Sequence, residues 1–546
     1  MSPTKEQSSF GSLRLQTAQK PAYVIYERHD EEPKVASWKQ VFETACSIAD
    51  RIIVRDAPAT TGVIITCNNE LNFAASLLAT WLSGATAIPT TNTMRRNLYD
   101  RNTHIYGHAE PDIVLHDLSK GRSLARLQEM APKAKLIDVR ETSVKHNPKK
   151  IQRIEGALLQ YTSGSTSNPK PVLLNNHDIR SGCKAIAHAY ELDEESTGIH
   201  WLPLYHDMGL IGSVVMPLWT GGTSVIMRPS AFIQEPSLWF KLATQWKARI
   251  TAAPNFAYEY VLSKLESADH ESVDLSSMVS MIIGGEPVQP ATLRRLYAAA
   301  PRLGLLASAI KPSYGMAEAT LLVSRYAGGH SKRVFSQRHS VEEITCVGEI
   351  VPQVEIEIRD SATNEPLNEG DLGDIWIFGE AVGRVIPTGD TWRKPPPKAP
   401  LNTGDIGFQE AGSLYIVARQ SNLLIIRGAN FYSEDIEAAL LNTQPPGAIT
   451  GIAAVSIKDS ELGTDALYLF IEIQSRANLI PDAEINTVLG GTFGLRAHEV
   501  IQLRSRSLPR TSSGKVIRRM AKTLYIEGKL DRFRLKSADC ESKDRY

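Results

Sequence analysis

Short apolar runs alternate with longer amphipathic stretches from about residue 35 to residue 310, and this alternation is the strongest constraint on the fold. Gly62–Cys67 (GVIITC) has the composition of a buried strand, and apolar residues in Asn72–Ser83 recur at helical spacing. Strands that alternate with helices form parallel sheets whose faces the helices cover. The sequence therefore predicts an α/β fold. Further strands are expected at Ala85–Pro89, Ile113–His116, Lys135–Val139, Ala157–Tyr161, Thr223–Met227, Ile250–Ala253 and Val279–Ile283, and helices at Ser237–Lys247 and Pro290–Ala299.

The pattern changes after about Ser324. Arg325–Thr345 is polar and basic and has no clear period. Shorter strands are expected at Val354–Arg359 and Asp374–Phe378, and a pair of strands is expected across Ser413–Arg427. The regular exchange of strand and helix therefore ends near this point.

The length of 546 residues predicts more than one lobe, because a single hydrophobic core stops growing at roughly 250–300 residues. We place a boundary near Arg419–Ile425, which divides the chain into residues 1–420 and 421–546. The second part is expected to be a small α+β unit. Its first helix is expected at Phe431–Asn442, with Ser433 as the N-cap and acidic residues in the first turn.

Charge and cysteine content argue against several classes of protein. Lys and Arg number 60, as do Asp and Glu, so the chain has no net field that would attract nucleic acid or anionic lipid. The five cysteines contain no C-x-x-C pair, which argues against a structural zinc site or a redox pair, and their odd, sparse count is typical of a reducing compartment. The N-terminus has no apolar signal-peptide core, and no apolar run is long enough to span a bilayer. A cytoplasmic protein without stable membrane insertion is expected.

Tyr161–Lys170 (YTSGSTSNPK) holds the densest group of phosphate-binding side chains in the sequence. It directly follows an apolar strand, and hydroxyls, backbone N–H groups and a lysine can together surround phosphate oxygens. The segment does not meet the Walker A pattern, and on composition alone a plain Ser/Thr/Pro turn between a strand and a helix explains it equally well. The candidate phosphate ligands are Thr162, Ser163, Gly164, Ser165, Thr166 and Lys170.

This segment, with Pro171 and Val172 after it, resembles the phosphate loop of the adenylate-forming superfamily, which includes acyl-CoA synthetases, adenylation domains of nonribosomal peptide synthetases, and luciferases. Six further segments resemble motifs of that superfamily in the same order along nearly the whole chain. They are Trp201–Gly212 (WLPLYHDMGLIG), Gly284–Val288 (GGEPV), Ser313–Thr320 (SYGMAEAT), Thr403–Phe408 (TGDIGF), Ile425–Glu437 (IIRGANFYSEDIE) and Leu508–Arg519 (LPRTSSGKVIRR). The segments WLPLYHDMGLIG and SYGMAEAT resemble the forms that these motifs take in fatty acyl-AMP ligases.

The resemblance implies a large N-terminal domain of two α/β subdomains and a distorted β-barrel, with a small mobile α+β C-terminal domain as a lid. It implies an enzyme that uses ATP and Mg²⁺ to convert a fatty acid to an acyl-adenylate with release of pyrophosphate. The acyl group would then pass to the phosphopantetheine thiol of an acyl carrier protein, in polyketide, lipopeptide or related lipid assembly. The alternative is an acyl-CoA synthetase that uses CoA as the acceptor.

Three residues are implied to act in catalysis. The reaction joins a carboxylate to a phosphate, and unit charges about 4 Å apart interact by about 4 kcal/mol at an effective dielectric of about 20. Lys515 is implied to offset this repulsion by bridging the two anions, although its basic surroundings also suit a solvated lysine. Glu318 is implied to hold Mg²⁺, with a surface helix acid as the alternative. His206 is implied to approach the substrate carboxylate, and a structural role is equally open.

A second group is implied to bind the adenylate. Tyr314 would lie against the adenine, or else be a core aromatic. Asp405 would accept hydrogen bonds from the ribose hydroxyls, with a turn aspartate as the alternative, and Arg419 would also reach the ribose. The other members are Gly285, Glu286, Pro287, Ser313, Gly315, Met316 and Ala317.

The chain departs from the family pattern at several positions. Ser167 and Pro171 replace glycines of the phosphate loop, which should stiffen it. Ser421–Asn422 stands where a hinge Asp or Lys is usual. Fatty acyl-AMP ligases carry an insertion near Arg325–Thr345 that hinders the use of CoA. This stretch is longer than in many CoA ligases but shorter than a full insertion, so both acceptors stay open.

A protein of another class, a nucleotide-binding scaffold without catalysis, is disfavoured because Lys515, Glu318 and Asp405 are all present. Hydrolase chemistry is disfavoured as well, since the sequence has no G-x-S-x-G elbow.

Overall fold

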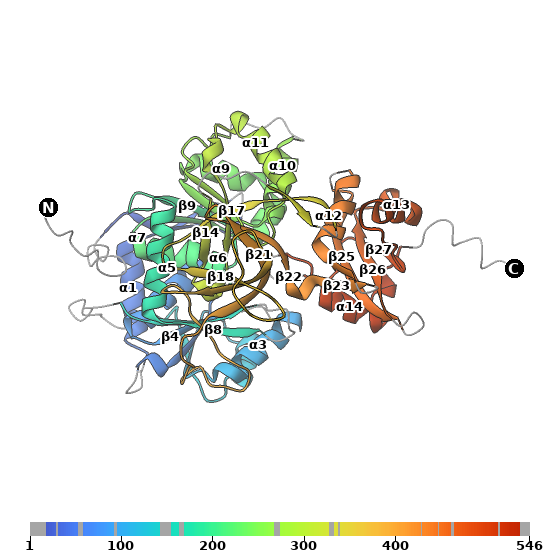
Figure 1. Cartoon of the computed structure of the whole chain (residues 1–546). Coiled ribbons are helices and arrows are strands. Elements are labelled where there is room, and N and C mark those ends of the chain that lie inside the picture. Colours follow the sequence, from blue (N-terminus) through green and yellow to red (C-terminus); the bar gives the residue numbers. More distant parts are fainter. Residues whose placement is uncertain are drawn as a thin grey trace.

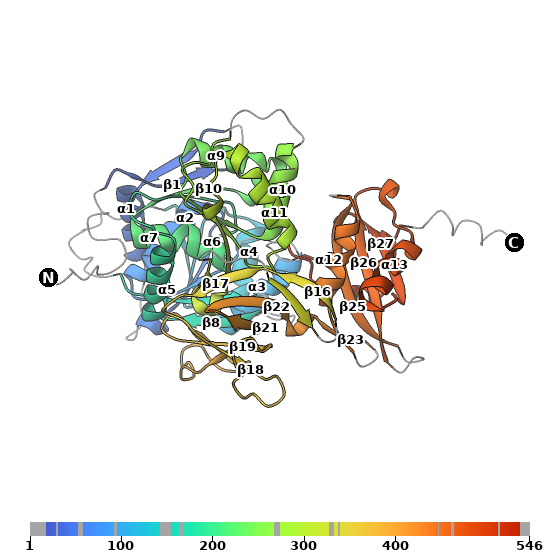
Figure 2. The ribbon, with the colours of Figure 1, turned by 45° about the horizontal axis from the view of Figure 1, so that its top comes forward.

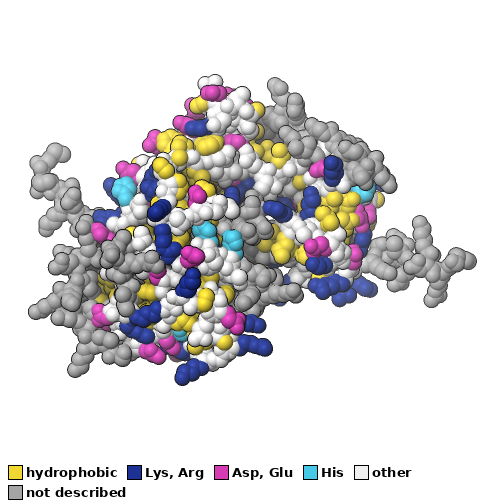
Figure 3. Space-filling model, turned by 90° about the horizontal axis from the view of Figure 1, so that it is seen from below, with side chains coloured by type: hydrophobic (Ala, Val, Ile, Leu, Met, Phe, Trp, Pro, Cys, Tyr) yellow, Lys and Arg dark blue, Asp and Glu magenta, His cyan; other side chains and the backbone are white. Residues whose placement is uncertain are grey.

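A large α/β body and a smaller C-terminal region make up the molecule (Figure 1). The computed structural model describes residues 18–28, 31–52, 58–91, 96–141, 154–162, 169–266, 273–326, 332–336, 339–426, 429–445, 447–459, 464–510 and 514–535. Among these residues, no helix combines the length and the apolar character that crossing a membrane requires. Figure 3 shows one face of the molecule, and on its described part Lys and Arg are interspersed with Asp and Glu. This mixture agrees with the zero net charge of the chain.

The first sheet has seven strands in the order β20-β8-β7-β4-β3-β5-β6. Its parallel strands are β3 (Gly62–Thr66), β4 (Thr86–Pro89), β5 (Ile113–His116), β6 (Lys135–Asp138) and β7 (Ala157–Thr162). Antiparallel β8 (Lys170–Leu174) and β20 (Arg384–Val385) extend one edge. Helices α1 (Trp38–Ala49), α2 (Glu70–Leu82), α3 (Arg96–Ala109) and α4 (Arg122–Met130) belong to this part of the chain. The predicted strands of this half are confirmed to within one or two residues.

The second sheet has 13 strands, in the order β18-β19-β21-β22-β17-β14-β13-β12-β11-β9-β10-β1-β2. Parallel pairing runs from β13 to β1, through β13 (Ile310–Gly315), β12 (Ser280–Ile283), β11 (Ile250–Ala253), β9 (Thr197–His200), β10 (Thr223–Met227) and β1 (Pro21–Tyr26), with β2 (Lys34–Ser37) antiparallel at the edge. The α/β fold is thereby confirmed.

Antiparallel strands continue this sheet beyond β13. They are β14 (Leu322–Arg325), β17 (Cys346–Ile350), β22 (Ser413–Arg419), β21 (Leu401–Glu410), β19 (Gly373–Phe378) and β18 (Glu355–Arg359). They come from the part of the sequence in which the helical pattern fades.

Helices cover both faces of the parallel part. α5 (Asn176–Ala189), α6 (Asp207–Leu210), the π-helical turn η4 (Ile211–Val215) and α7 (Met216–Thr220) share a hydrophobic core with the first sheet. α8 (Pro229–Gln234), α9 (Ser237–Gln245), α10 (Asn255–Glu266) and α11 (Pro290–Ala299) belong to a second core, which contains Trp239, Phe240 and Tyr258. Two layers of helix therefore bury the sheet that carries the pocket described below.

The C-terminal region has apolar clusters of its own, formed by residues between Leu424 and Leu535. Its elements are β23 (Leu423–Ile426), β24 (Ala429–Tyr432), α12 (Ser433–Thr443), β25 (Ile449–Asp459), β26 (Thr464–Ile473), α13 (Asp482–Phe493), β27 (Glu499–Arg504) and α14 (Arg518–Ile526). The prediction of Ser433 as an N-cap is wrong, because Tyr432 occupies that position. The Ser433 hydroxyl instead donates to the Asn422 carbonyl at 3.0 Å.

The polar stretch Arg325–Thr345 forms more structure than its sequence suggested. β15 (Lys332–Ser336) and β16 (His339–Ile344) pair as an antiparallel hairpin. β16 contacts α13, so the hairpin links the large body to the C-terminal region (Figure 2). Backbone pairing in a hairpin needs no apolar alternation, which is why periodicity did not reveal it.

A buried ion-pair network joins α12 to α14. Arg518 contacts Glu437 through Nε and Nη2, at 2.7 and 2.6 Å, and contacts Glu434 at 3.0 Å. Glu437 is 7 % exposed and also accepts a hydrogen bond from the Ala454 amide at 2.8 Å. Burial raises the pKa of Glu437, and the Arg518 guanidinium opposes that shift.

We expect Arg518→Leu to lower the free energy of unfolding of the C-terminal region by about 3 kcal/mol, because it leaves a buried carboxylate without its cation. Hydrogen exchange of the β25 and β26 amides measures this loss. Arg504→Leu, an exposed change on β27, is the matched control and should change protection little. Equal protection in the two variants would contradict the role given to Arg518.

Candidate active site

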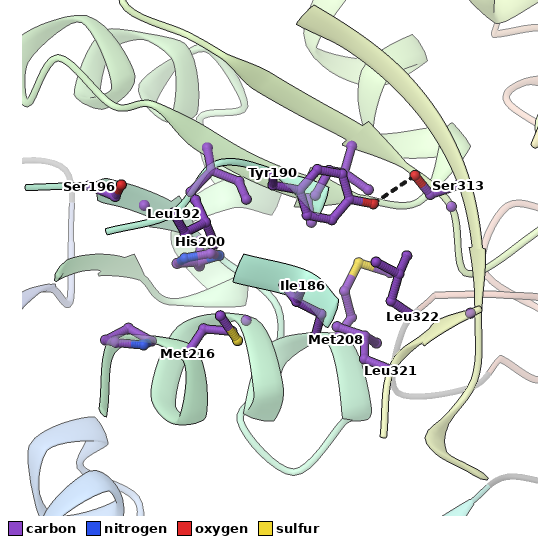
Figure 4. Close-up of a pocket in the computed structure, with 18 of the residues that line it drawn as sticks. Ile186, Tyr190, Leu192, Ser196, His200, Met208, Met216, Ser313, Leu321 and Leu322 are labelled. Atoms are coloured by element: carbon purple, nitrogen blue, oxygen red, sulfur yellow. Dashed lines mark hydrogen bonds between the residues drawn. The ribbon is translucent and has the colours of Figure 1, made fainter. Parts of the chain in front are cut away.

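A pocket with an empty volume of about 910 Å³ lies between the second sheet and the helices α5 to α7 (Figure 4). Alternate residues of the strands face it, because side chains two positions apart point to one side of a sheet. These residues are Gly198 and His200 of β9, Ile250 and Ala252 of β11, and Ile282 of β12. Ile186, Gly212 and Met216 line the helical wall. The pocket is therefore mostly apolar along its length.

Residues from three of the predicted motifs bound the same pocket. Asp207 comes from WLPLYHDMGLIG, Gly284 and Gly285 from GGEPV, and Tyr314 from SYGMAEAT. Gly284 and Gly285 follow β12, and Tyr314 lies near the end of β13, so both sets lie at the carboxyl edge of the parallel strands. Open α/β sheets bind ligands at this edge.

Glycine allows these strand ends to approach one another. A Cβ on Gly315 would lie 1.9 Å from the Leu321 carbonyl oxygen, and one on Gly284 would lie 2.6 Å from that of Ser313. The Met316 amide donates to the Leu321 carbonyl at 2.8 Å and closes the turn into β14. Ala317 is buried in that turn, whereas Pro287 is exposed. The Ser313 hydroxyl lies 2.9 Å from the Tyr190 hydroxyl (Figure 4).

Lys515 reaches this edge from the C-terminal region. Its Nζ donates to the carbonyl oxygen of Gly285, although 230 positions separate the two residues. Gly514 precedes it with φ of +90°, a conformation that glycine adopts without strain. A Cβ on Gly514 would lie 3.3 Å from the Phe256 ring, so this turn sits close against α10. The structure thus brings Lys515 to Gly285 and to the pocket.

The Lys515 charge acts on the carboxyl groups of Asp207, Glu286 and Asp405, and Glu318 adjoins Asp207 and Asp405. Burial raises the pKa of Glu286, Glu318 and Asp405. The Lys515 charge acts in the opposite direction on Glu286 and Asp405, and Asp207 and Asp405 add to the rise at Glu318. The Glu286 carboxylate also accepts a hydrogen bond from the Phe256 amide at 2.9 Å. A buried acidic cluster of this kind attracts cations.

Asp405 is held by two neighbours. Tyr314 donates its hydroxyl to Asp405 Oδ2 at 2.6 Å, and Arg419 Nε lies 3.5 Å from Oδ1. Asp405 and Arg419 are directly opposite one another on β21 and β22. The Tyr314 hydroxyl is therefore hydrogen-bonded to this polar pair, whereas an aromatic residue with only a core role would lack such a contact.

His206 and Asp207 form a close pair at the start of α6. His206 Nδ1 lies 2.6 Å from Asp207 Oδ1, which also accepts the Met208 amide at 2.7 Å. Burial alone would raise the pKa of Asp207, but the charge of His206 and these hydrogen bonds lower it to about 2. Asp207 is consequently an anion near neutral pH. The role of His206 at a substrate carboxylate stays a prediction.

The two ends of the predicted phosphate segment lie on antiparallel strands, so the segment connects two strands and not a strand and a helix. Thr162 and Lys170 are opposite one another on β7 and β8, and the Thr162 hydroxyl donates to the Lys170 carbonyl at 3.4 Å. Ser163, Gly164, Ser165 and Thr166 lie outside the described residues. β8 contacts the turn Ala317–Ala319, which carries Glu318. The strand that follows the segment therefore packs against the turn that carries Glu318.

Arg101 is a cation that the sequence analysis did not single out. Its Nη2 donates to the Tyr161 carbonyl at 3.0 Å, immediately before the hydroxyl-rich segment. Burial lowers the pKa of Arg101, and Tyr205 opposes this. In the sequence, Arg101 is a single basic residue in a polar helix. Nothing in that pattern distinguishes it from a surface arginine.

A lysine and buried acids at the carboxyl edge of a parallel sheet, beside an apolar pocket, are the groups that an adenylate-forming enzyme requires. The chain belongs to the AMP-binding enzyme family, whose model matches residues 13–385.

Similar proteins cover most of this chain. It is 29% identical to 4-hydroxyphenylalkanoate adenylyltransferase of Mycobacterium tuberculosis, over 96% of this chain and 93% of the relative. It is 28% identical to medium-chain-fatty-acid–[acyl-carrier-protein] ligase JamA of Moorena producens, over 95% and 94%. The solved structure of a fatty acid AMP ligase from Legionella pneumophila matches with a TM-score of 0.66 and 25% identity, over 94% of each chain. These likenesses confirm the resemblance to adenylate-forming enzymes.

Tyr314→Phe should make adenosine binding more sensitive to acid. The change removes a hydrogen bond that lowers the pKa of Asp405, so this already raised pKa should rise further. The ionised carboxylate is the acceptor expected for ribose hydroxyls, so affinity is present above that pKa and is lost as the pH falls through it. Calorimetric titration with adenosine across a pH series checks the shift, because adenosine has no titrating phosphate.

Tyr190→Phe is the matched control, because that hydroxyl contacts Ser313 and not Asp405. The two variants should therefore differ in the pH at which affinity is lost. Coincident profiles would show that the Tyr314 hydroxyl does not govern the ionisation of Asp405.

Proposed function

We propose that this enzyme activates a fatty acid with ATP to form an acyl-adenylate and then transfers the acyl group to the phosphopantetheine thiol of an acyl carrier protein. The observation that carries this proposal is the contact of Lys515 with Gly285, where the apolar pocket adjoins the acidic cluster. Relatives named for adenylyl transfer and for ligation to an acyl carrier protein support it. So does the likeness to a fatty acid AMP ligase.

In the first step, a carboxylate oxygen attacks the α-phosphorus of ATP, and the bond from that phosphorus to the pyrophosphate oxygen breaks. Both reactants are anions, so their approach needs positive charge at the point of attack. Lys515 Nζ lies at the edge of the pocket and supplies that charge there. A preformed donor in this position stabilises charge that develops in the transition state.

In the second step, the thiol sulfur attacks the acyl carbonyl carbon. A thioester bond forms, the carbon–oxygen bond to AMP breaks, and AMP leaves with that oxygen while the thiol proton passes to solvent or to a base. Asp405, Tyr314 and Arg419 would hold the nucleotide at its ribose and adenine during both steps. Gly285, Glu286, Pro287, Ser313, Gly315, Met316 and Ala317 would line the rest of the adenylate site.

Glu318 fits a role in holding Mg²⁺. Its carboxyl group is surrounded by the charges of Asp207 and Asp405, and hard cations prefer carboxylate and phosphate oxygens. Within the described residues no group of three or more His, Cys, Asp or Glu side chains could hold a metal on its own. Phosphate oxygens of the nucleotide would thus complete the ligand set. When bound, Mg²⁺ would neutralise phosphate charge. Thr162, Lys170 and the hydroxyl-rich segment between them would contact those phosphates.

We further propose that residues 421–546 act as a lid on an enzyme that works in the cytoplasm. Separate apolar clusters in this region support independent movement. Because Lys515 belongs to it, the position of the region would set whether the catalytic charge is present. The short segment Gln420–Asn422 between β22 and β23 is the natural place for a hinge.

Replacing the catalytic lysine tests the first step. We expect Lys515→Ala to lower fatty-acid-dependent ATP–pyrophosphate exchange by roughly 10²–10³, as is typical when one preorganised donor is removed. Lys529→Ala is the matched control, since Lys529 is exposed in the same region and pairs with Glu527. Unchanged exchange by a folded Lys515→Ala protein would remove this assignment.

The acceptor is tested in a separate assay. Incubation with ATP, Mg²⁺ and a fatty acid should yield a thioester on holo-acyl carrier protein, with little acyl-CoA when CoA replaces it. The contact of β16 with α13 supports this preference for the carrier protein over CoA, because it would restrain a rotation of the C-terminal region. Apo-carrier protein, which lacks the thiol, is the control. Comparable formation of acyl-CoA, identified by mass, would favour the acyl-CoA synthetase alternative.

A further inference from the structure

One imidazole ring lies in the lining of the mostly apolar pocket. His200 ends β9, is 6 % exposed, and lies beside Leu192, Ser196 and Met216, away from Ser313 and Leu322 (Figure 4). It is separate from His206, which pairs with Asp207. No motif of the sequence analysis includes it, and the reaction steps above do not use it.

His200 differs from the other polar side chains of the pocket in having no hydrogen-bond partner among the described residues. Ser196 bonds Asp193, Thr220 bonds the Met216 carbonyl, Thr223 bonds the Pro21 carbonyl, Tyr190 bonds Ser313, and Tyr314 bonds Asp405. The ring nitrogens are not among the fully buried unpaired atoms of the described residues, so they reach the open space of the pocket. The missing partner can be a group of the ligand.

Two glycines allow the ring to occupy its place in the pocket wall. A Cβ on Gly198 would lie 2.5 Å from His200 Nε2, so only glycine at that position leaves the ring where it is. Gly212 faces the ring from the helical wall, where a Cβ would lie 3.7 Å from Cε1. Both glycines also line the pocket. The residues around the ring are thus small enough to hold an imidazole in the lining of the pocket.

We propose that His200 recognises an uncharged hydrogen-bonding group, such as a hydroxyl or a phenol, carried by the acyl substrate away from its carboxylate. The inference rests on the proposed function, because it takes the pocket to be the acyl site. A neutral imidazole has one N–H donor and one acceptor nitrogen, and a hydroxyl can pair with either of them, because it both donates and accepts. Recognition of this kind makes His200 a specificity-determining residue.

The ring is matched to a neutral partner and not to a second carboxylate. Burial lowers the pKa of His200 to about 4, so the imidazole is uncharged near neutral pH. A second carboxylate deep in the pocket would have no opposing charge there and would bear the cost of burial. Dicarboxylic acids are therefore expected to be poor substrates.

The test compares matched acids in ATP–pyrophosphate exchange. The panel pairs straight-chain acids with hydroxylated forms of the same length, and phenylalkanoic with 4-hydroxyphenylalkanoic acids. We expect the parent enzyme to prefer at least one hydroxylated member by about tenfold in kcat/KM, the size of one neutral hydrogen bond. His200→Leu should abolish that preference, and His200→Gln should keep part of it.

Met216→Leu is the matched control, because it changes the same wall without removing a hydrogen-bonding group. It should leave the ratio between paired acids unchanged, whatever it does to the absolute rates. Thermal unfolding tests a merely structural role, which would lower the stability of His200→Leu without moving the ratio. A parent ratio near one for every pair, or the same ratio in His200→Leu, would overturn the inference.

Failure of the inference and failure of the proposed function give different results. If unsubstituted acids support exchange and hydroxylated acids are not preferred, the proposed role of His200 is wrong. The proposed function is then still supported. If no acid supports exchange, the proposed function fails. Calorimetric binding of the same pairs then decides, and tighter binding of a hydroxylated acid that is lost in His200→Leu would still support the role of the ring.

Discussion

The positive charge of one lysine balances a site that is otherwise rich in acid. Lys515 contacts the Gly285 carbonyl, and its charge favours the ionised forms of Asp207, Glu286 and Asp405. Burial opposes ionisation at Glu286 and Asp405, so these carboxyls depend on nearby cations to stay charged. The lysine belongs to the C-terminal region, whereas the acids belong to the large body. The electrostatics of the site therefore depend on how the two are positioned.

The position of that contact follows from where strands end. β12 and β13 are parallel neighbours, so the glycines after one and the Tyr314 turn of the other meet at the same edge. The chain then reverses into β14 and continues as antiparallel strands, which bring Asp405 and Arg419 to the same place in direct register. A parallel sheet supplies the pocket, and an antiparallel extension supplies the Asp405–Arg419 pair beside it. Neither half would form the site alone.

The sequence predicted local features better than long-range ones. Thr223–Met227 and Ile250–Ala253 are strands as predicted, because a short buried run encodes its own conformation. The Ser433 cap failed because a tertiary bond to Asn422 displaced the local one, and the β15–β16 hairpin had no apolar period to detect. The bond between Tyr314 and Asp405 joins residues 91 positions apart, and no spacing rule reaches that far. Motif resemblance placed these residues in one site, and the structure supplied the contacts.

His200 shows why the residues that line the pocket were the hardest to predict from the sequence. A histidine at the end of a short strand looks the same in sequence whether it bonds a neighbour or faces a cavity. The distinction comes from Gly198 and Gly212, which belong to different elements and meet only at the ring. The His200 nitrogens are not among the fully buried unpaired atoms of the described residues, so they face the space of the pocket, where a ligand group can pair with them. A polar ring whose hydrogen-bonding edge faces a mostly apolar pocket is best explained by selectivity for a ligand.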